Sequence, residues 1–368
     1  MKRIALVLAS ICFAGSAHAA DPLLESAAAF TGQIFHLSTG VPGVVIAAVR
    51  DGESAVYGFG ETEKGNGTEP DADTRIAVAS ITKSFTGLVM ASLVADGTIA
   101  LTDPAGPHVK LVDALPERDG HTIRFVDLAT HASGLGRELE PVPGAEKYTD
   151  AAFAANLVDG ALLFAPGTGI SYSNIGFDVL GMALSGAAGM PYADLMQARV
   201  LDPLGLSATG YNVPRGENAF TGYDWNGNAM AVEQPISNRF GASSLTTTPR
   251  DMVGYLEWNL DRFGVEGAEA RAISHAAHLI RDGLDPVFGL DESGRMDAMG
   301  LGWVIMMPEG NRPLIIQKAG GTNGIFSYIA FAPTRGVGVF MAINQFDFAA
   351  GMEMATVAND LIAALAPR

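Results

Sequence analysis

The feature that most constrains the fold is the placement of β-prone runs at the two ends of the chain. Near the N-terminus, the runs 43–50 and 54–60 flank the turn dipeptide Asp51-Gly52, which predicts a β-hairpin. Near the C-terminus, apolar, β-branched and aromatic runs broken by Gly, Pro and Asn predict three or four more strands, at residues 301–306, 313–318, 325–331 and 337–343. A closing helix is predicted from about residue 349 to 365.

Helical patterns occupy the middle of the chain, at residues 80–96, 149–158, 174–188, 191–201, 248–259 and 267–281. Strands at both ends with helices between them predict an α+β fold: one antiparallel sheet built from N- and C-terminal strands, flanked by helices, with a mostly helical inserted subdomain. We expect a single domain over 21–368, with an α/β part at about 21–97 and 300–368 and a helical part at about 98–299. The polar stretch 214–228 is interpreted as a surface loop.

The first twenty residues predict a secretory signal peptide. Lys2 and Arg3 precede an apolar run over 4–14, and the small residues around His18 suit a cleavage site. The apolar run is too short to span a bilayer, and no later segment offers eighteen uninterrupted apolar residues. The sequence therefore predicts a periplasmic or secreted protein with no membrane span.

Charge and cysteine content exclude several classes of function. The 23 Lys and Arg against 40 Asp and Glu leave a net charge of −17, which argues against a nucleic-acid partner. The one cysteine, Cys12, lies in the predicted signal peptide, so we expect no disulfide, thiolate metal site or cysteine nucleophile in the mature chain. Hydrophobic residues at 48% are typical of a globular protein with a large core.

A candidate nucleophile lies at the start of the first long helical pattern. The chain has no Gly-x-Ser-x-Gly, His-Glu-x-x-His, Walker or Gly-x-Gly-x-x-Gly motif, but it has Ser80-Ile-Thr-Lys83. The i, i+3 spacing places the hydroxyl and the amine on one helix face. A desolvated lysine with a lowered pKa can take the serine proton, which makes the hydroxyl nucleophilic. The structural alternative is that Ser80 is only a helix N-cap.

Two further motifs could complete a site. Tyr172-Ser173-Asn174 follows a Pro-Gly turn before a helical pattern, where Tyr172 is an acid/base candidate or a core residue with its hydroxyl outward. Lys318-Ala319-Gly320-Gly321 ends a predicted strand. A cation beside a glycine-permitted close backbone approach suits an anionic substrate terminus and an oxyanion hole, although a strand ending in a turn has the same pattern.

In this order and spacing, the three motifs resemble the penicillin-recognising serine hydrolases, most closely the class C β-lactamase branch. Further segments in family order extend the resemblance over most of residues 40–345, among them Arg75–Gly87, Asp127–Leu135, Ala165–Thr168, Asp202–Leu206, Gly300–Trp303 and Ile315–Gly321. Within the branch, the region 297–318 is most similar to periplasmic D-alanyl-D-alanine carboxypeptidase/endopeptidases. The resemblance implies a β-lactamase/transpeptidase-like fold and no metal or cofactor.

The resemblance also implies catalytic roles. Ser80 would be the acylated nucleophile and Lys83 its activator. Tyr172 would relay protons to the leaving group and activate the deacylating water. Lys318 would keep Tyr172 acidic and help to bind the substrate carboxylate.

Substrate-binding roles follow in the same way. Asn174 would hydrogen-bond the substrate amide and Lys83, and the backbone N–H groups of Ser80 and Gly321, next to Gly320, would form the oxyanion hole. Ala319 departs from the family, which usually has Thr or Ser there. Loss of that hydroxyl could cost roughly 1.5–3 kcal/mol of binding. Arg137 and Glu138 are expected at the wall of the site.

Other polar residues are interpreted as structural. His131 is expected to hydrogen-bond within a helix-loop junction rather than act as a triad base. His275 and His278 could face one metal, but no third ligand has a fitting spacing. The alternating Asp224–Asn228 segment lacks the acidic residue that completes a calcium loop and predicts a turn.

The leading hypothesis is an exported serine hydrolase that forms an acyl-enzyme with D-Ala-D-Ala peptidoglycan stem peptides and is acylated by β-lactams through mimicry. A class C-type β-lactamase and a carboxylesterase of the same fold remain alternatives, the latter motivated by Ala319. A non-enzymatic alternative is a silent module that only holds wall peptides.

Overall fold

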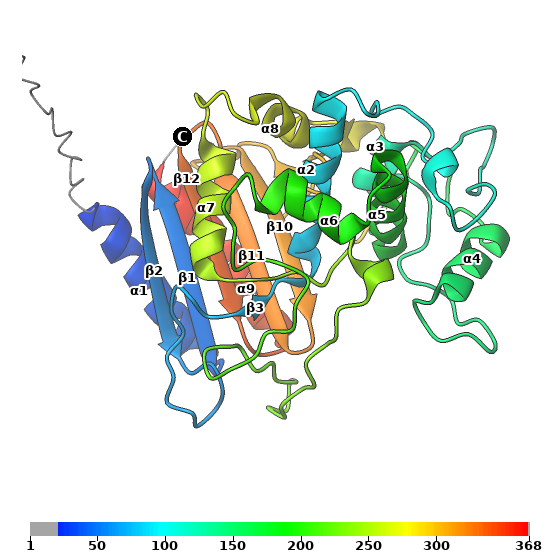
Figure 1. Cartoon of the computed structure of the whole chain (residues 1–368). Coiled ribbons are helices and arrows are strands. Elements are labelled where there is room, and N and C mark those ends of the chain that lie inside the picture. The colour runs from blue at the N-terminus through cyan, green and yellow to red at the C-terminus, as the bar shows by residue number, and fades with distance from the viewer. Residues whose placement is uncertain (1–20, 367–368) are drawn as a thin grey trace, which may run out of the picture.

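An antiparallel sheet of eight strands forms the centre of the computed structural model, which describes residues 21–366 (Figure 1). The predicted signal peptide over 1–20 lies outside the described residues. The strand order is β2-β1-β12-β11-β10-β9-β8-β6. The strands are β1 (Gly43–Arg50), β2 (Glu53–Gly60), β6 (Leu279–Ile280), β8 (Ala298–Met299), β9 (Val304–Met306), β10 (Ile315–Thr322), β11 (Ile325–Ala332) and β12 (Val337–Ile343).

The predicted hairpin and the predicted union of the two chain ends are both confirmed. Asp51 and Gly52 have φ angles of 50° and 86°, as a type I′ turn requires, and they join β1 to β2. β1 also pairs with β12, from Val44 opposite Ile343 onward. Seven of the eight β1 residues are buried, which explains why this strand is a continuous apolar run rather than an alternating one.

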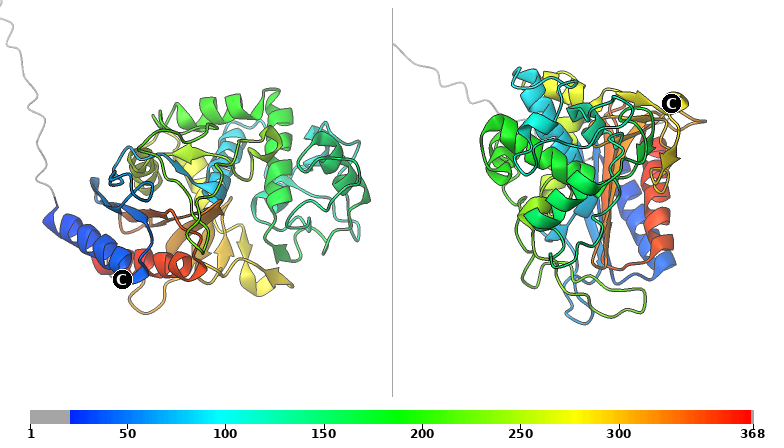
Figure 2. Two further views of the ribbon diagram at one scale, coloured as in Figure 1. Left: turned by 90° about the horizontal axis from the view of Figure 1, so that it is seen from below. Right: turned by 90° about the vertical axis from the view of Figure 1, so that its right-hand side faces the viewer.

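Two terminal helices cover one face of the sheet, and the right-hand view of Figure 2 shows them as a separate layer. α9 (Phe348–Leu365) was predicted, but α1 (Pro22–Thr39) was not. Its signals are in the sequence: Asp21 accepts hydrogen bonds from the N–H groups of Leu23 and Leu24, and Gly40 ends the helix at φ 66°. α9 is long and apolar enough for a bilayer, but it packs on β11 and β12 as a core helix.

The remaining helices lie on the opposite face and beyond it. They are α2 (Thr82–Ala95), α3 (Phe125–Ala129), α4 (Asp150–Asp159), α5 (Asn174–Ala188), α6 (Tyr192–Met196), α7 (Pro249–Leu260) and α8 (Ala268–His275). Residues 197–201 continue α6 as a π-helical turn. The predicted helix over 267–281 is wrong beyond residue 275, because the His278 N–H donates to the Met299 carbonyl (2.8 Å) where the chain enters β6.

Short strand pairs connect the sheet to the helical region. β3 (Ile76–Ala77) pairs with β5 (Thr246–Thr247), and β4 (Ile170–Ser171) pairs with β7 (Val287–Phe288). The expected part boundary at residue 300 divides the sheet, since β6 and β8 come from the segment assigned to the helical part. The predicted α+β class is confirmed, and the helical segment is packed on the sheet through α2 and α7.

Candidate active site

Ser80 lies in a tight turn between strand and helix. β3 ends at Ala77, a single 3-10 turn covers 79–81, and α2 begins at Thr82. Ala79, which precedes the nucleophile, has φ 46°, a conformation that non-glycine residues adopt only where the surroundings enforce it. The surroundings here are β5 and β10. The side chain of Ser80 caps no helix, so the N-cap alternative for this residue is wrong.

Lys83 is completely buried beside Ser80. Its Nζ lies 3.1 Å from Ser80 Oγ, 2.7 Å from Asn174 Oδ1 and 2.8 Å from the Ala242 carbonyl oxygen. Burial, with the nearby Lys318 cation, holds the pKa of Lys83 well below its ordinary value. A neutral amine has two N–H donors, which Asn174 and Ala242 accept, and one lone pair, which then faces the Ser80 hydroxyl. The geometry suits a general base.

Tyr172 is placed by its neighbour Ser173, the N-cap of α5. The Ser173 hydroxyl accepts from the Gly176 N–H and donates to the Gly136 carbonyl (2.7 Å), and its N–H donates to His131 Nδ1 (3.1 Å). These bonds bring the Tyr172 hydroxyl to 2.7 Å from Ser80 Oγ. Ser80 Oγ thus lies between the amine and the phenol.

The expectation that Tyr172 is acidic in the free protein is wrong. Burial raises the pKa of Tyr172 to about 12, and this effect exceeds the lowering by the Ser80 hydrogen bond and by Arg137. The phenol is therefore protonated at neutral pH, so its resting role is that of a hydrogen-bond donor to Ser80 Oγ.

His131 supports this arrangement without entering it. The ring is 1% exposed and stacks on the Tyr172 ring at a centroid distance of 4.5 Å. Burial and the cations Lys318 and Lys83 hold the pKa of His131 well below its ordinary value, so the imidazole is neutral. The structural interpretation of this histidine is confirmed, since its Nδ1 is occupied by a backbone donor.

Asn174 is the first residue of α5, and its amide is held from two sides. Oδ1 accepts from Lys83, and Nδ2 donates to Glu138 Oε1. The second carboxylate oxygen of Glu138 accepts from the Tyr148 hydroxyl (3.0 Å) and lies 3.5 Å from the Arg239 guanidinium. Glu138 therefore fixes which end of the Asn174 amide faces Lys83. Sequence reasoning placed Glu138 near the site but did not identify this contact.

β10 brings the third motif against the nucleophile turn. The position of a Cβ on Gly320 would lie 2.2 Å from the Val78 carbonyl oxygen, so only glycine allows this approach. Ser327, opposite Gly320 in β11, also donates to the Val78 carbonyl (3.2 Å). Lys318 is 6% exposed, and its Nζ lies 5.1 Å from the centroid of the Tyr172 ring. Burial lowers the pKa of Lys318 to about 8.

A cavity of about 300 Å³ opens in front of these groups, lined by the cations Arg137 and Lys318 and by one carboxylate, Glu292, whose charge opposes the lowering of the Lys318 pKa. It is called the cationic cavity below because the cations outnumber the carboxylate. All the predicted site residues except Lys83 line it: Ser80, Tyr172, Asn174, Lys318, Ala319, Gly320 and Gly321. β9 pairs with β10 only as far as Gln317, so within residues 21–366 no strand pairs with this edge of β10 from Lys318 onward. An extended peptide could add to such an edge.

Arg137 is where it was expected, with its guanidinium 4.7 Å from the centroid of the Tyr172 ring. Sequence reasoning missed the Ala242 carbonyl and the apolar wall formed by Phe326, Phe346, Phe348 and Met352. No local motif marks these groups, because they come from segments far apart in the chain. The sequence signal that could have indicated the apolar wall was the apolar start of the C-terminal helix.

The residues interpreted as structural do not join the site. His275 hydrogen-bonds Asn259 Oδ1 (2.7 Å) and His278 hydrogen-bonds the Ile273 carbonyl (2.8 Å). Asp224 accepts from the N–H groups of Asn226 and Asn228, as expected for a turn. Within residues 21–366, no group of three His, Cys, Asp or Glu side chains is placed to hold a metal ion.

Comparison with known proteins identifies the family. The beta-lactamase family model matches residues 20–364. The chain is 31% identical to the D-alanyl-D-alanine-carboxypeptidase/endopeptidase AmpH of Escherichia coli (strain K12), over 99% of this chain and 97% of the relative. It is 28% identical to a beta-lactamase of Lysobacter lactamgenus, over 83% of each chain.

Solved structures show the same fold. The beta-lactamase/D-alanine carboxypeptidase of Yersinia pestis, complexed with citrate, superposes with a TM-score of 0.82 at 29% identity, over 93% of this chain and 98% of that one. A class C beta-lactamase superposes with a TM-score of 0.77 at 20% identity, over 93% of this chain and 96% of that one. The predicted fold and the predicted enzyme class are confirmed: the chain belongs to the beta-lactamase family and is a serine hydrolase.

Proposed function

We propose that this protein is an exported DD-carboxypeptidase/endopeptidase that cleaves D-Ala-D-Ala-type stem peptides of peptidoglycan through an acyl-enzyme at Ser80. One observation carries the proposal: Ser80 Oγ lies 3.1 Å from Lys83 Nζ and 2.7 Å from the Tyr172 hydroxyl, beside a cavity lined by two cations. The relative named as a carboxypeptidase/endopeptidase, matched over nearly the whole chain, supports the same activity.

Acylation follows from the charge states of the free site. Lys83, whose pKa is well below its ordinary value because it is buried, accepts the Ser80 proton as Oγ attacks the peptide carbonyl carbon. The N–H groups of Ser80 and Gly321 bind the oxyanion. As the C–N bond breaks, Tyr172, protonated in the free enzyme, gives its proton to the leaving amine. The leaving D-amino acid keeps its carboxylate near Arg137 and Lys318.

Deacylation reverses the proton transfers. Water gives a proton to the Tyr172 phenolate formed in the first step and attacks the acyl carbon. Ser80 Oγ then leaves and takes its proton back from the Lys83 ammonium. Both groups return to their resting states, so the cycle balances without a cofactor.

A β-lactamase activity is the second candidate, because relatives at 24–28% identity are named as beta-lactamases and a solved class C beta-lactamase has the same fold. Ala319 weakens the case for an efficient β-lactamase, since the usual hydroxyl for binding a substrate carboxylate is absent, and it requires that a peptide carboxylate be held by other groups such as Arg137. The carboxylesterase alternative rests on the same residue.

Intact-mass measurement over time with a penicillin, with the free drug followed in the same tubes, separates these activities. A stable adduct on Ser80 with little drug consumed, together with D-alanine release from a pentapeptide, supports the peptidase. Rapid drug loss with a transient adduct supports the β-lactamase. No adduct and no D-alanine release, with turnover of short acyl esters, overturns the proposal in favour of the esterase. Ser80→Ala is the control and should give no adduct.

A further inference from the structure

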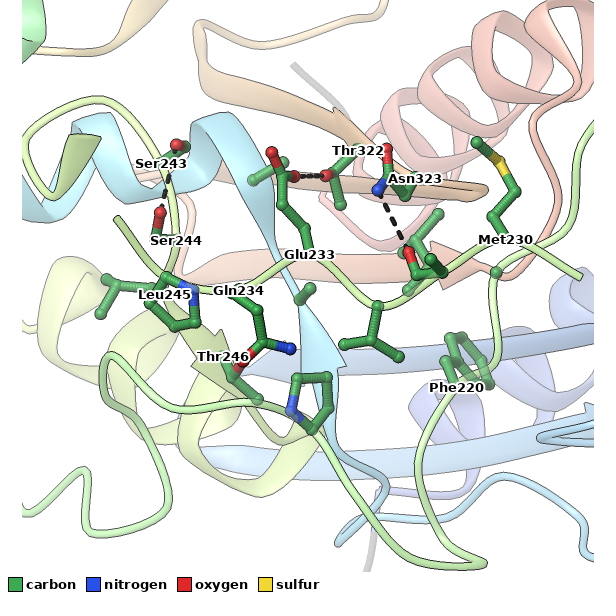
Figure 3. Close-up of a pocket in the computed structure, with 18 of the residues that line it drawn as sticks. Phe220, Met230, Glu233, Gln234, Ser243, Ser244, Leu245, Thr246, Thr322 and Asn323 are labelled. Atoms are coloured by element: carbon green, nitrogen blue, oxygen red, sulfur yellow. Dashed lines mark hydrogen bonds between the residues drawn. The ribbon is translucent and has the colours of Figure 1, made fainter. Parts of the chain in front are cut away.

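A second, smaller cavity, drawn in Figure 3, adjoins the nucleophile turn, since Ala77 and Ala79 are part of its lining. It has a volume of about 50 Å³ and is bounded by three segments: the loop 230–235, residues 243–246, and the end of β10 at Thr322 and Asn323. Ala79, the residue before the nucleophile, is part of its lining. The cavity is therefore within one residue of Ser80 along the chain.

Glu233 is the one charged residue among the described residues that line this cavity. Thr322 Oγ1 donates to Glu233 Oε2 (2.6 Å), and Asn323 Nδ2 donates to the Ala231 carbonyl (3.1 Å). Figure 3 shows both bonds between the loop and the strand end. The first bond holds the exposed Glu233 carboxylate at the end of the β10 edge and the second holds the loop there, so the cavity is called the anionic cavity below.

One cation that Glu233 influences is Arg239, which follows the same loop. Burial lowers the pKa of Arg239, but the charges of Asp178, Glu138 and Glu233 raise it overall. Its Nε lies 3.2 Å from Asp178 Oδ2, and its guanidinium stacks at 4.1 Å on the Tyr148 ring. Arg239 is thus engaged by other groups and does not line the anionic cavity.

The charges of the two cavities indicate in which orientation a peptide binds along the open β10 edge. Arg137 and Lys318 lie at one end of the open β10 edge, and Glu233 lies at the other, beyond Thr322. A peptide whose terminal carboxylate lies by the cations must extend its acyl part toward Glu233. The scissile carbonyl then lies at Ser80, between the two ends.

We propose that the anionic cavity binds an ammonium group on the acyl part of the substrate, as an aliphatic diamino acid residue carries it. This inference rests on the proposed function. The volume, about 50 Å³, has room for an ammonium group, since about 10–15 Å³ of such space already holds one water molecule. The neighbouring side chains of Met230, Val232 and Phe220 are apolar and suit the methylene groups that carry such an amine.

The test measures binding on a Ser80→Ala background, where no peptide is cleaved. Two pentapeptides ending in D-Ala-D-Ala carry either lysine or the uncharged norleucine at the third position. We expect the lysine peptide to bind about five- to tenfold more tightly at low salt, and this preference to disappear on Glu233→Gln. The matched control is Glu217→Gln, which removes the same charge from an exposed side chain outside both cavities.

Equal binding of the two peptides to the Ser80→Ala protein overturns the inference. So does a lysine preference that survives Glu233→Gln or that disappears equally with Glu217→Gln. The proposed function fails separately, if the protein with Ser80 intact binds these peptides but releases no D-alanine from either of them.

Discussion

The two cavities beside Ser80 differ in what holds them. In the cationic cavity the groups around Ser80 belong to regular elements, the buried strand β10, the start of α5 and the packed turn before α2, and only its outer wall, with Arg137, is irregular. The anionic cavity depends on an irregular loop that is mostly exposed and is tied to β10 by two side-chain hydrogen bonds. Bond-forming groups need positions accurate to a fraction of an ångström, which packed elements supply. Substitutions in a loop can change the lining of a cavity without moving the bond-forming groups.

This comparison predicts that a substitution changes activity most at the packed nucleophile turn and least in the cavity walls. Substitutions at the nucleophile turn should affect every substrate alike. Substitutions in the cavities should separate substrates by their charge. The following experiments are ordered accordingly.

Replacing the buried base should have the largest effect. Lys83→Met keeps most of the side-chain volume but removes the amine that faces Ser80 Oγ at 3.1 Å. We expect the rate of acylation by a fluorescent penicillin to fall by about 10²- to 10⁴-fold. Thermal unfolding serves as the control for folding. A variant that acylates at nearly the original rate would exclude Lys83 as the base.

Displacing β10 from the nucleophile turn should come next. In Gly320→Ala the new methyl group would lie 2.2 Å from the Val78 carbonyl oxygen, so the strand must shift. A shift near 1 Å predicts about a 100-fold loss of acylation rate with every substrate. Gly283→Ala is the matched control, because its Cβ meets no atom within 4 Å. Equal rates for the two variants would contradict the packing argument.

Restoring the missing hydroxyl should separate substrates. Ala319→Thr adds a donor beside Lys318 in the cationic cavity. We expect KM for peptides with a free terminal carboxylate to fall about tenfold, since one such bond contributes roughly 1.5 kcal/mol. Neutral esters should show no change. Ala319→Val has the same shape without the hydroxyl, and an equal gain there would show that shape rather than hydrogen bonding is responsible.

A dependence on pH should be no larger than the effect of Ala319→Thr. The pKa of Lys318 is about 8, so the side chain is charged below that pH and loses its charge above it. We expect kcat/KM for carboxylate-ended peptides to decrease as pH rises through about 8. At one pH unit above that value, kcat/KM should be about tenfold lower than at low pH. A neutral ester should lack this decrease, because it has no carboxylate for Lys318 to bind. A matching decrease with the ester would assign the titration to another group.

Some of the fold and site could be predicted because the signals are local. The Asp51-Gly52 turn needs two left-handed residues, and Ser80 and Lys83 share a helix face by spacing alone. α1 was missed although its cap residues and its buried positions Leu24, Ala28, Gly32 and Phe35 follow helical spacing. The helix over 267–281 was predicted too long, because pairing of β6 with β8 is a long-range contact.

Other parts of the site depend on segments that only folding brings together. The Ala242 carbonyl holds Lys83 across a separation of 159 residues, and Glu138 orients the Asn174 amide. The protonation of Tyr172 reverses the expectation from its motif, since burial acts against the phenolate.

The sequence by itself determined which groups can react and on which elements they stand, because turn chemistry, helix spacing and strand patterning are properties of neighbouring residues. Only the tertiary structure decided their charge states, the approach of β10 to the nucleophile turn and the opposite charges of the two cavities. Desolvation and electrostatic fields depend on every group packed nearby, whatever its distance along the chain.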